Sequence, residues 1–259
     1  MDADLTLALR LADLADAVTL PRFRASDLRV TRKPDRTPVT DADTAAEDAL
    51  RAELATAAAG DAVVGEERGG AVPDSGRGWV LDPIDGTKNF SRGMPVWASL
   101  IALTVHGRAV VGVASAPALG RRWWAAAGAG AWTSDAPGGP ARRIGVSGVA
   151  ELADCAVSTT NLNTFREHGT LDAWLALTER CWETRAFGDF WQHCLVAEGT
   201  IDLAVEPEAS VWDLAALQVI VEEAGGRFTD LAGTPTFAGG NAVASNGALH
   251  DAALACFAV

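Results

Sequence analysis

Two aspartates, Asp82 and Asp85, stand three residues apart where an apolar run of the chain ends. Their carboxylates, with the peptide carbonyl of Ile84 between them, offer the hard oxygen ligands that Mg²⁺ prefers. Gly86 and Thr87 follow at the predicted start of a helix, where free backbone N–H groups suit a phosphate. Asp-Pro followed by Asp-Gly is also an ordinary turn sequence, so this segment alone does not establish a site.

Further acidic residues at comparable positions favour a metal site. Glu66 and Glu67 follow the predicted strand Ala62–Val64, and Asp213 lies in the first turn of a helix expected to begin after Ser210. Each has a structural alternative, because Asp213 could be a capping-box partner of Ser210 and the two glutamates a solvated loop edge. A capping carboxylate keeps one oxygen free, so capping and metal binding are compatible.

The overall charge restricts the partners of such a site. With 34 acidic against 21 basic side chains, the chain carries a formal charge of -13 at pH 7. This charge argues against binding to nucleic acid or to an anionic membrane. A phosphate-handling protein of this kind needs cations at its site, because clustered carboxylates repel phosphate.

The composition predicts a folded protein that needs no disulfides. Hydrophobic residues make up 49% and charged residues 21% of the 259 positions, which allows a sizeable core. The cysteines show no CxxC spacing, and we expect them to be reduced and mostly buried. They are Cys155, Cys181, Cys194 and Cys256.

The N-terminal half is predicted to form two helices and then a multi-stranded sheet. Charges interrupt the first twenty residues too often for a signal peptide, so we expect an amphipathic helix there. Its predicted apolar stripe is Leu7, Leu11, Leu14 and Val18. A second helix, 41–58, should have Thr40 as its N-cap, with Asp41 and Asp43 favouring its first turn. The predicted strands are Ala62–Val64, Trp79–Leu81, Ala98–Val105, Ala109–Ala114, Arg122–Ala125 and Ala131–Thr133.

The C-terminal half alternates strands and helices more regularly, which favours a mixed or partly parallel sheet covered by helices. The predicted strands are Cys155–Thr159, Trp182–Ala186 and Ile201–Val205, and the predicted helices are Leu171–Arg180, Phe190–Ala197 and 211–224. The last helix should bury Leu214, Leu217, Val221 and Ala224 and end at Gly225. We expect two units, 1–150 and 151–259, that form one compact body.

The chain resembles the inositol monophosphatase family over nearly its whole length, through four motifs in the family's order and spacing. They are Lys33-Pro-Asp-Arg-Thr-Pro-Val-Thr-Asp-Ala-Asp43, Gly65-Glu-Glu67, Leu81-Asp-Pro-Ile-Asp-Gly-Thr-Lys-Asn-Phe90, and Trp212-Asp-Leu-Ala-Ala216 with Glu223-Ala-Gly-Gly226. The resemblance implies an α+β fold. It is a layered sandwich with a largely antiparallel N-terminal sheet and a mixed C-terminal sheet, both flanked by helices.

The resemblance also assigns roles to single residues. The implied metal ligands, for two or three Mg²⁺ ions, are Glu66, Asp82, Asp85, Asp213 and the carbonyl of Ile84. Asp43 corresponds to an aspartate that binds a further ion through water. The implied catalytic residues, which position or activate the attacking water, are Asp43, Glu66 and Thr87. The implied contacts to the phosphate and its surroundings are Gly86, the backbone of Thr87, Asp85 and Asp213.

Phosphomonoester hydrolysis needs this kind of site. A phosphomonoester dianion repels a nucleophile and releases a poor alkoxide leaving group. An enzyme must therefore neutralise the phosphoryl oxygens, activate a water and stabilise the leaving oxygen, which metal ions held by carboxylates can do. The sequence predicts in-line hydrolysis of a small phosphate ester without a phosphoenzyme.

The substrate side is predicted from two segments of the C-terminal half. Arg185 and Asp189 lie where a strand turns into a helix, and Glu206 follows another predicted strand, so all three are expected to contact the substrate. The structural alternatives are an N-cap for Asp189 and a surface charge for Glu206. The segment Asn161–Gly169 is expected to be a loop near the pocket.

Among subfamilies, the chain looks most like the histidinol-phosphatases. The parallels are Pro95-Val-Trp-Ala-Ser-Leu100, Ser115-Ala-Pro-Ala118 with Arg122-Trp-Trp124, Gly188-Asp-Phe190 and Glu206-Pro-Glu-Ala-Ser-Val-Trp-Asp213. Histidinol phosphate carries an ammonium and an imidazole, which acidic groups such as Asp189 and Glu206 would suit. Inositol carries only hydroxyls.

Three alternatives remain open at this level. One is an inositol or broad-specificity sugar monophosphatase, and another is a non-catalytic regulatory or RNA-machinery-binding member of the fold. The third is a magnesium-binding structural protein, which has no reason to keep Thr87 beside the carboxylates. We expect a cytoplasmic homodimer that binds neither nucleic acid nor membrane.

Overall fold

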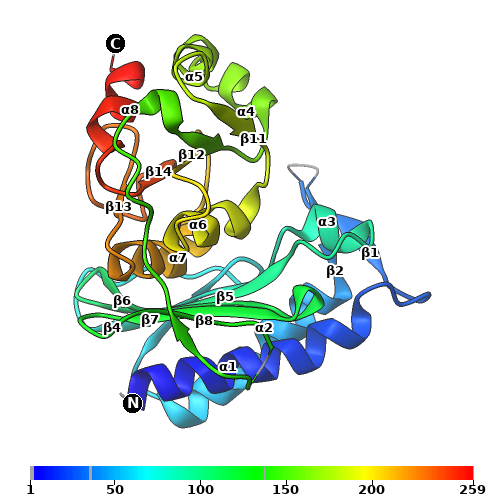
Figure 1. Ribbon diagram of the computed structural model, residues 1–259. Helices are drawn as coiled ribbons and strands as arrows, with labels where there is room; N and C mark the ends of the chain where they lie inside the picture. The colour runs from blue at the N-terminus through cyan, green and yellow to red at the C-terminus, as the bar shows by residue number, and fades with distance from the viewer. Residues whose placement is uncertain (1–2, 35–36, 137, 259) are drawn as a thin grey trace.

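The computed structural model describes residues 3–34, 37–136 and 138–258. Within these residues, the strands form a seven-stranded sheet (the large sheet), a five-stranded sheet (the small sheet) and a two-stranded hairpin. Helices and sheets alternate in layers, which confirms the predicted α+β sandwich (Figure 1). Asp35 and Arg36, from the first family motif, lie outside the described residues.

The large sheet is antiparallel except at one edge, where β3 runs parallel to β4. Its strands, in spatial order, are β3 (Ala62–Gly65), β4 (Arg77–Asp85), β5 (Ala98–Val105), β6 (Arg108–Ala116), β7 (Arg121–Ala126), β8 (Gly130–Ser134) and β9 (Arg142–Arg143). Its central strands are buried on both faces, because helices cover both. This confirms the largely antiparallel N-terminal sheet.

Helices α1 (Ala3–Thr19) and α2 (Asp41–Ala57) cover the outer face of the large sheet (Figure 1). The predicted stripe of α1 is only partly right: Leu11 is fully buried, while Leu7 and Leu14 are partly buried against the same core. The buried side chains are Leu5, Ala8, Leu11, Ala12 and Ala15. Small alanines let the helix lie close against the sheet and α2, so a stripe chosen by leucine spacing misses most of the buried face. Helix α2 begins as predicted, with Thr40 as its N-cap.

The small sheet is mixed, as predicted. Strand β10 runs parallel to both β11 and β12, while β14 is antiparallel to β12 and β13. The strands, in spatial order, are β11 (Glu183–Arg185), β10 (Ala156–Ser158), β12 (Leu203–Glu206), β14 (Ala242–Ser245) and β13 (Arg227–Thr229). Helices α4 (Leu162–Glu167), α5 (Leu171–Thr178) and α8 (His250–Phe257) complete its outer layer (Figure 1).

Helices α6 (Asp189–Ala197) and α7 (Val211–Glu223) lie between the two sheets (Figure 1). The predicted stripe of α7 is confirmed, since Leu214, Leu217 and Val221 are buried. The helix also buries its other faces, and a Cβ on Gly112 of β6 would lie 2.3 Å from the Ala216 carbonyl oxygen. This glycine therefore permits the close approach of α7 to the large sheet.

The largest buried apolar cluster takes residues from both halves of the chain, including Leu100 and Trp123 from the large sheet and Ala244 from the small one. The predicted boundary at residue 150 falls between β9 and β10, in the connection between the sheets. The division into two units stays a prediction, since this core belongs to both.

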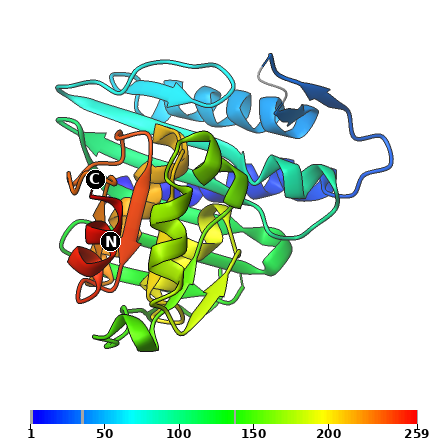
Figure 2. The same ribbon diagram turned by 90° about the horizontal axis from the view of Figure 1, so that it is seen from above.

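The remaining elements lie mainly around the N-terminal half. They are η1 (Leu20–Arg22), β1 (Val30–Arg32), β2 (Pro38–Thr40), α3 (Thr87–Ser91), η2 (Pro117–Leu119) and η3 (Leu152–Asp154). Seen from above, the C-terminal half covers part of the large sheet and leaves α2 and the β1–β2 region uncovered (Figure 2). No helix within the described ranges is long and apolar enough to cross a bilayer.

Candidate active site

Strand β4 continues four residues past its predicted end and carries two aspartates into the middle of the molecule. The pairing with β5 shifts register between Asp82 and Asp85, at a bulge that contains Pro83. Proline fits such a position because it has no N–H to donate to the ladder. The Asp82 carboxylate accepts a hydrogen bond from Ile84 N at 3.0 Å, and Gly86, at φ 84°, then begins α3.

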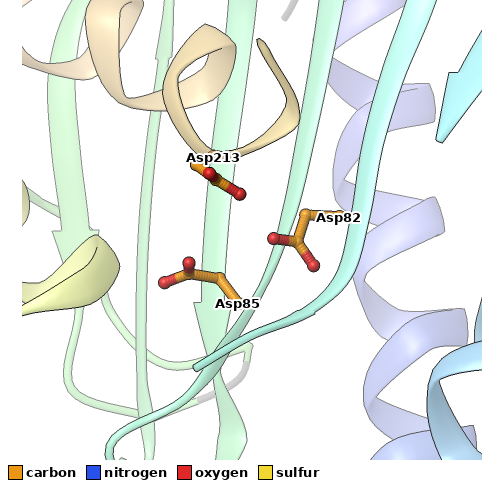
Figure 3. Close-up of side chains that lie close together, drawn as sticks. All are labelled: Asp82, Asp85 and Asp213. Carbon is orange, nitrogen blue, oxygen red and sulfur yellow. The ribbon is translucent and has the colours of Figure 1, made fainter. Parts of the chain in front are cut away.

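Three carboxylates converge at this bulge, and we call Asp82, Asp85 and Asp213 the acidic centre. Each offers an oxygen within 4.8 Å of the others, and the side chains point toward one another (Figure 3). Asp82 and Asp85 are only 1% and 8% exposed. Burial, followed by repulsion from the neighbouring carboxylates, raises the pKa of both well above the ordinary value. An all-oxygen set of buried, mutually repelling carboxylates fits a hard divalent cation.

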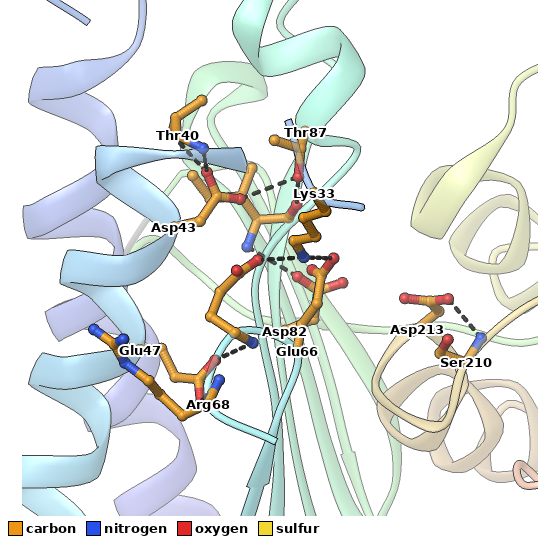
Figure 4. Close-up of polar contacts among 12 residues, drawn as sticks. Lys33, Thr40, Asp43, Glu47, Glu66, Arg68, Asp82, Thr87, Ser210 and Asp213 are labelled. Carbon is orange, nitrogen blue, oxygen red and sulfur yellow. Dashed lines mark hydrogen bonds and ion pairs between the residues drawn. The ribbon is translucent and has the colours of Figure 1, made fainter. Parts of the chain in front are cut away.

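Asp213 serves two purposes at the start of α7. Its Oδ2 accepts a hydrogen bond from Ser210 N at 2.7 Å, so the predicted capping interaction exists (Figure 4). The carboxylate still contributes an oxygen to the acidic centre. Burial raises its pKa to about 7, against the opposing effect of the Ser210 hydrogen bond. Capping and metal binding are therefore compatible here, as the sequence suggested.

Asp43 has the same arrangement at the start of α2. Its Oδ2 accepts from Thr40 N at 2.8 Å and from the Thr40 hydroxyl at 2.5 Å. Its Oδ1 lies 3.1 Å from the Thr87 hydroxyl, which is also 2.9 Å from the Ile84 carbonyl oxygen (Figure 4). Burial raises the pKa of Asp43 to about 6. The helix cap thus aims a carboxylate at the hydroxyl of Thr87.

Glu66 lines the same cleft from the end of β3, although it is not among the three carboxylates whose oxygens lie within 4.8 Å of one another. Its backbone N–H donates to the Leu81 carbonyl at 3.2 Å, which extends the β3–β4 pairing. Lys33 bridges Glu66 and Glu67, with its Nζ 2.7 Å from a carboxylate oxygen of each. The predicted loop edge is thus partly buried and is anchored by a lysine from the first motif.

Sequence reasoning missed Glu47, a fully buried residue on α2. Its carboxylate accepts from the backbone N–H of Glu67 at 2.7 Å and of Arg68 at 3.1 Å, and pairs with Arg51 at 2.7 Å. It therefore fixes the turn that presents Glu66. The signal was available, because Asp43, Glu47 and Arg51 recur every four residues and so share one face of the helix.

A cleft of about 760 Å³ opens beside the acidic centre, and residues of both halves line it. On its C-terminal side, Asp189 is the first residue of α6, after the N-cap Gly188, so the predicted capping role of Asp189 is wrong. Its φ is 47°, and its backbone N–H donates to the Thr160 hydroxyl at 2.8 Å. Its Oδ2 accepts from the side chain of Asn89 at 3.0 Å.

The start of α6 also touches the acidic centre directly. The backbone N–H of Phe190 donates to Asp85 Oδ2 at 2.6 Å. Burial is the main cause that raises the pKa of Asp189, and the charge of Lys88 opposes it. The turn that holds Asp189 therefore also orients one carboxylate of the acidic centre.

Glu206, at the end of β12, is only 7% exposed, so the alternative of a surface charge is wrong. One of its oxygens accepts hydrogen bonds from the Thr160 hydroxyl and from the side-chain amide of Gln192. Burial, with repulsion from Asp189 and Asp213, raises its pKa well above the ordinary value. We call Thr160, Asp189 and Glu206, which line the cleft, together with the buried Gln192 that supports Glu206, the C-terminal wall.

The structure differs from two predictions about the C-terminal side of the cleft. Arg185 does not line the cleft, because its exposed side chain contacts Glu183 and the Thr184 carbonyl. The segment Asn161–Gly169 is not simply a loop, since most of it forms α4. It nevertheless contributes to the cleft through Asn161 and Thr164.

The sequence and fold match known proteins over almost their whole length. The profile of the inositol monophosphatase family matches residues 2–258. The histidinol-phosphatase of Mycobacterium tuberculosis is 55% identical over 251 residues, 97% of this chain and 96% of that protein. The histidinol-phosphatase of Streptomyces coelicolor is 53% identical over 253 residues, 96% and 94% of the two chains. The solved structure of an inositol monophosphatase from Zymomonas mobilis superposes with a TM-score of 0.84 at 34% identity, covering 99% of each chain.

Proposed function

The chain belongs to the inositol monophosphatase family and is a metal-dependent phosphoric monoester hydrolase, and from this premise we propose that its substrate is L-histidinol phosphate. The observation that carries the proposal is the pair of carboxylates on the C-terminal wall, the buried Glu206 and the partly buried Asp189, which both line the cleft. The two histidinol-phosphatases that match at more than half identity support it.

We propose Mg²⁺ as the metal, with two or three ions per site. The donors are Glu66, Asp82, Asp85, Asp213 and the Ile84 carbonyl, with Asp43 acting through water. When bound, Mg²⁺ supplies Lewis-acid activation of water and neutralises charge on the phosphoryl and leaving oxygens. The all-oxygen character of these donors supports this choice of cation.

The chain itself orients the attacking water. The Thr87 hydroxyl donates to Asp43 Oδ1, which leaves the lone pairs of the Thr87 oxygen to accept a proton of that water. Asp43 is held in turn by two hydrogen bonds from Thr40, so its carboxylate faces the Thr87 hydroxyl in one orientation. Glu66, at the end of β3, also helps to orient this water. The arrangement places the water before reaction, which lowers the entropic part of the barrier.

The phosphate lies at the turn between β4 and α3. Gly86 and Thr87 present backbone N–H groups there, and the first N–H groups of a helix have no intrahelical acceptor. Asp85 and Asp213 border the same space, so their charges must be compensated for the dianion to enter.

The leaving group lies against the C-terminal wall. A carboxylate buried beside other carboxylates is unfavourable until a cation pairs with it. The ammonium and the imidazole of histidinol would supply donors to Asp189 and Glu206, and a charge-assisted hydrogen bond contributes about 1.5–3 kcal/mol. A polyol such as inositol offers only neutral hydroxyls.

A substrate comparison tests the proposal. We expect L-histidinol phosphate to be hydrolysed with a higher kcat/KM than inositol 1-phosphate or a sugar phosphate, measured by phosphate release with Mg²⁺ present. Preference for inositol 1-phosphate would instead identify an inositol monophosphatase, like the Zymomonas mobilis protein of similar fold. Absence of any phosphate release would indicate a non-catalytic member.

We also propose that the enzyme is a cytoplasmic homodimer that binds neither nucleic acid nor membrane. The net charge of -13 supports the absence of these two partners. Light scattering of the purified protein should give about twice the chain mass of 26.9 kDa.

A further inference from the structure

Three of the four cysteines gather at the end of the small sheet away from the cleft. Cys155 immediately precedes β10, Cys181 follows α5, and Cys256 lies on α8. All three pack in the same buried cluster, and no disulfide links them. Neither the acidic centre nor the C-terminal wall uses any of these thiols.

Cys155 and Cys181 are placed together by the parallel pairing of β10 and β11. Ala156 pairs with Glu183, and Glu183 N donates to the Cys155 carbonyl at 3.1 Å. The two cysteines therefore stand just before the paired ends of adjacent strands. The two side chains pack in the same buried cluster, close enough for each thiol to affect the pKa of the other.

The two thiols differ in exposure and reactivity. Cys155 is fully buried, whereas Cys181 is partly exposed. The hydrogen bond from Cys155 lowers the pKa of Cys181, and the adjacent Arg180 guanidinium adds to this effect. The same contact, with burial, raises the pKa of Cys155. A partly exposed thiol of lowered pKa next to a buried thiol is the arrangement of an attacking and a resolving cysteine.

We propose that Cys155 and Cys181 form a redox-active thiol pair that a hydroperoxide converts to a disulfide. The Cys181 thiolate attacks the peroxide, breaking the O–O bond and giving a sulfenic acid and hydroxide from hydrogen peroxide, or an alkoxide from an organic hydroperoxide. The Cys155 sulfur then attacks the sulfenic sulfur, forming the S–S bond and releasing water with the Cys155 proton. The protein loses two electrons, and the peroxide is reduced.

The chain segment that this disulfide would close also lines the cleft. The segment between the two cysteines contains α4 and α5 and supplies Thr160, Asn161 and Thr164 to the lining of the cleft. Strand β11 leads from Cys181 toward Asp189. A disulfide would close the segment that forms one side of the cleft into a covalent loop.

The full-length protein allows a direct test, because cleavage after Arg and Lys places the four cysteines in four different peptides. The reduced protein is treated with hydrogen peroxide at neutral pH, denatured, and its free thiols are counted. We expect the count to fall from four to two. Peptide mapping without reductant should show one cross-linked species, joining the Cys155 and Cys181 peptides, that dithiothreitol removes.

Single cysteine variants show which thiols form the disulfide. Cys256→Ser should still lose two thiols on oxidation, while Cys181→Ser should keep its three remaining thiols. An unchanged thiol count in the wild-type protein, or a cross-link from Cys181 to Cys256, would overturn the proposal. The peptide map of the wild-type protein decides the question even if a variant fails to fold. Because no phosphatase assay is involved, the outcome is independent of the proposed substrate.

Discussion

The acidic centre and the C-terminal wall face each other across one cleft but are built differently. In the acidic centre, Asp82 and Asp85 come from a single bulged strand end, and Asp213 is a helix-capping residue. In the wall, Asp189 and Glu206 come from a strained helix start and a separate strand, joined through Thr160. Local backbone structure positions the first group, whereas tertiary contacts position the second.

This difference suggests that the two regions have different functions. Carboxylates fixed by a strand bulge and by helix caps keep their geometry whatever the ligand, which suits metal binding and the chemical step. Carboxylates held by side-chain hydrogen bonds can be replaced by their amides one at a time without moving the backbone that holds the metal ligands. The first region should therefore control turnover of every substrate, and the second the choice among substrates.

Metal removal should have the largest effect and should act on all substrates alike. Without cations the acidic centre repels the phosphate, and loss of ~4 kcal/mol of transition-state stabilisation lowers turnover about a thousandfold. Phosphate release is measured after exhaustive chelation, and Mg²⁺ is then added back to confirm that the protein has stayed folded. Undiminished turnover in the chelated protein would remove the metal mechanism.

Asp213→Asn should have the next largest effect and separates chemistry from folding in one residue. Asparagine keeps a side-chain oxygen that can accept from Ser210 N, so this capping-box contact survives. We expect kcat to fall at least about a hundredfold on both histidinol phosphate and p-nitrophenyl phosphate. The thermal unfolding temperature of the metal-free variant should be no lower than that of the metal-free wild type, because the variant lacks one buried, repelling charge. An active variant with normal Mg²⁺ dependence would make Asp213 a capping residue only.

Asp189→Asn and Glu206→Gln should sharpen the comparison by affecting one substrate class. Each variant removes a charge-assisted hydrogen bond to the histidinol nitrogens, so kcat/KM on histidinol phosphate should drop by about one to two orders of magnitude. On p-nitrophenyl phosphate, whose leaving group carries no cationic nitrogen, the loss should be small. Equal losses on both substrates would assign these residues to the metal site or to folding.

Gln192→Leu should produce the smallest effect and tests whether the wall works as a unit. The Gln192 amide donates to Glu206, so its removal leaves that carboxylate less well oriented. We expect about a fivefold rise in KM for histidinol phosphate, equivalent to ~1 kcal/mol, with kcat little changed. Gln218→Leu is the matched control, since Gln218 donates to Glu222 at 2.8 Å on the surface of α7. Equal changes in both variants would argue against a positioning role.

The acidic centre was predictable from sequence because its determinants are local. Thr40 with Asp43, and Ser210 with Asp213, are helix-start patterns that place a carboxylate by spacing alone. The motif around Asp85 was also identified, although β4 extends further than expected. The burial of β4 on both faces and its bulge depend on the layers packed against it. The local sequence around Asp85 does not reveal these layers.

The wall and the first helix were less predictable, for the same physical reason. Arg185 was expected to contact the substrate. On strand β11, however, it lies on the same side as Glu183, and its side chain contacts that residue. The buried face of α1 depends on how closely alanines such as Ala8 pack against the sheet, not on leucine spacing. The spacing of Glu47 shows which helix face it shares with Asp43, but it acts through backbone groups twenty residues away, so only the fold shows what it binds.

The backbone of Asp189 limits how readily this enzyme could acquire a different specificity. Its φ of 47° is tolerated by aspartate, asparagine and glycine but disfavoured for β-branched or bulky side chains. A residue that cannot hold this conformation would shift the next N–H, which Asp85 accepts. Laboratory evolution toward an uncharged leaving group should therefore recover asparagine or glycine here far more often than apolar residues.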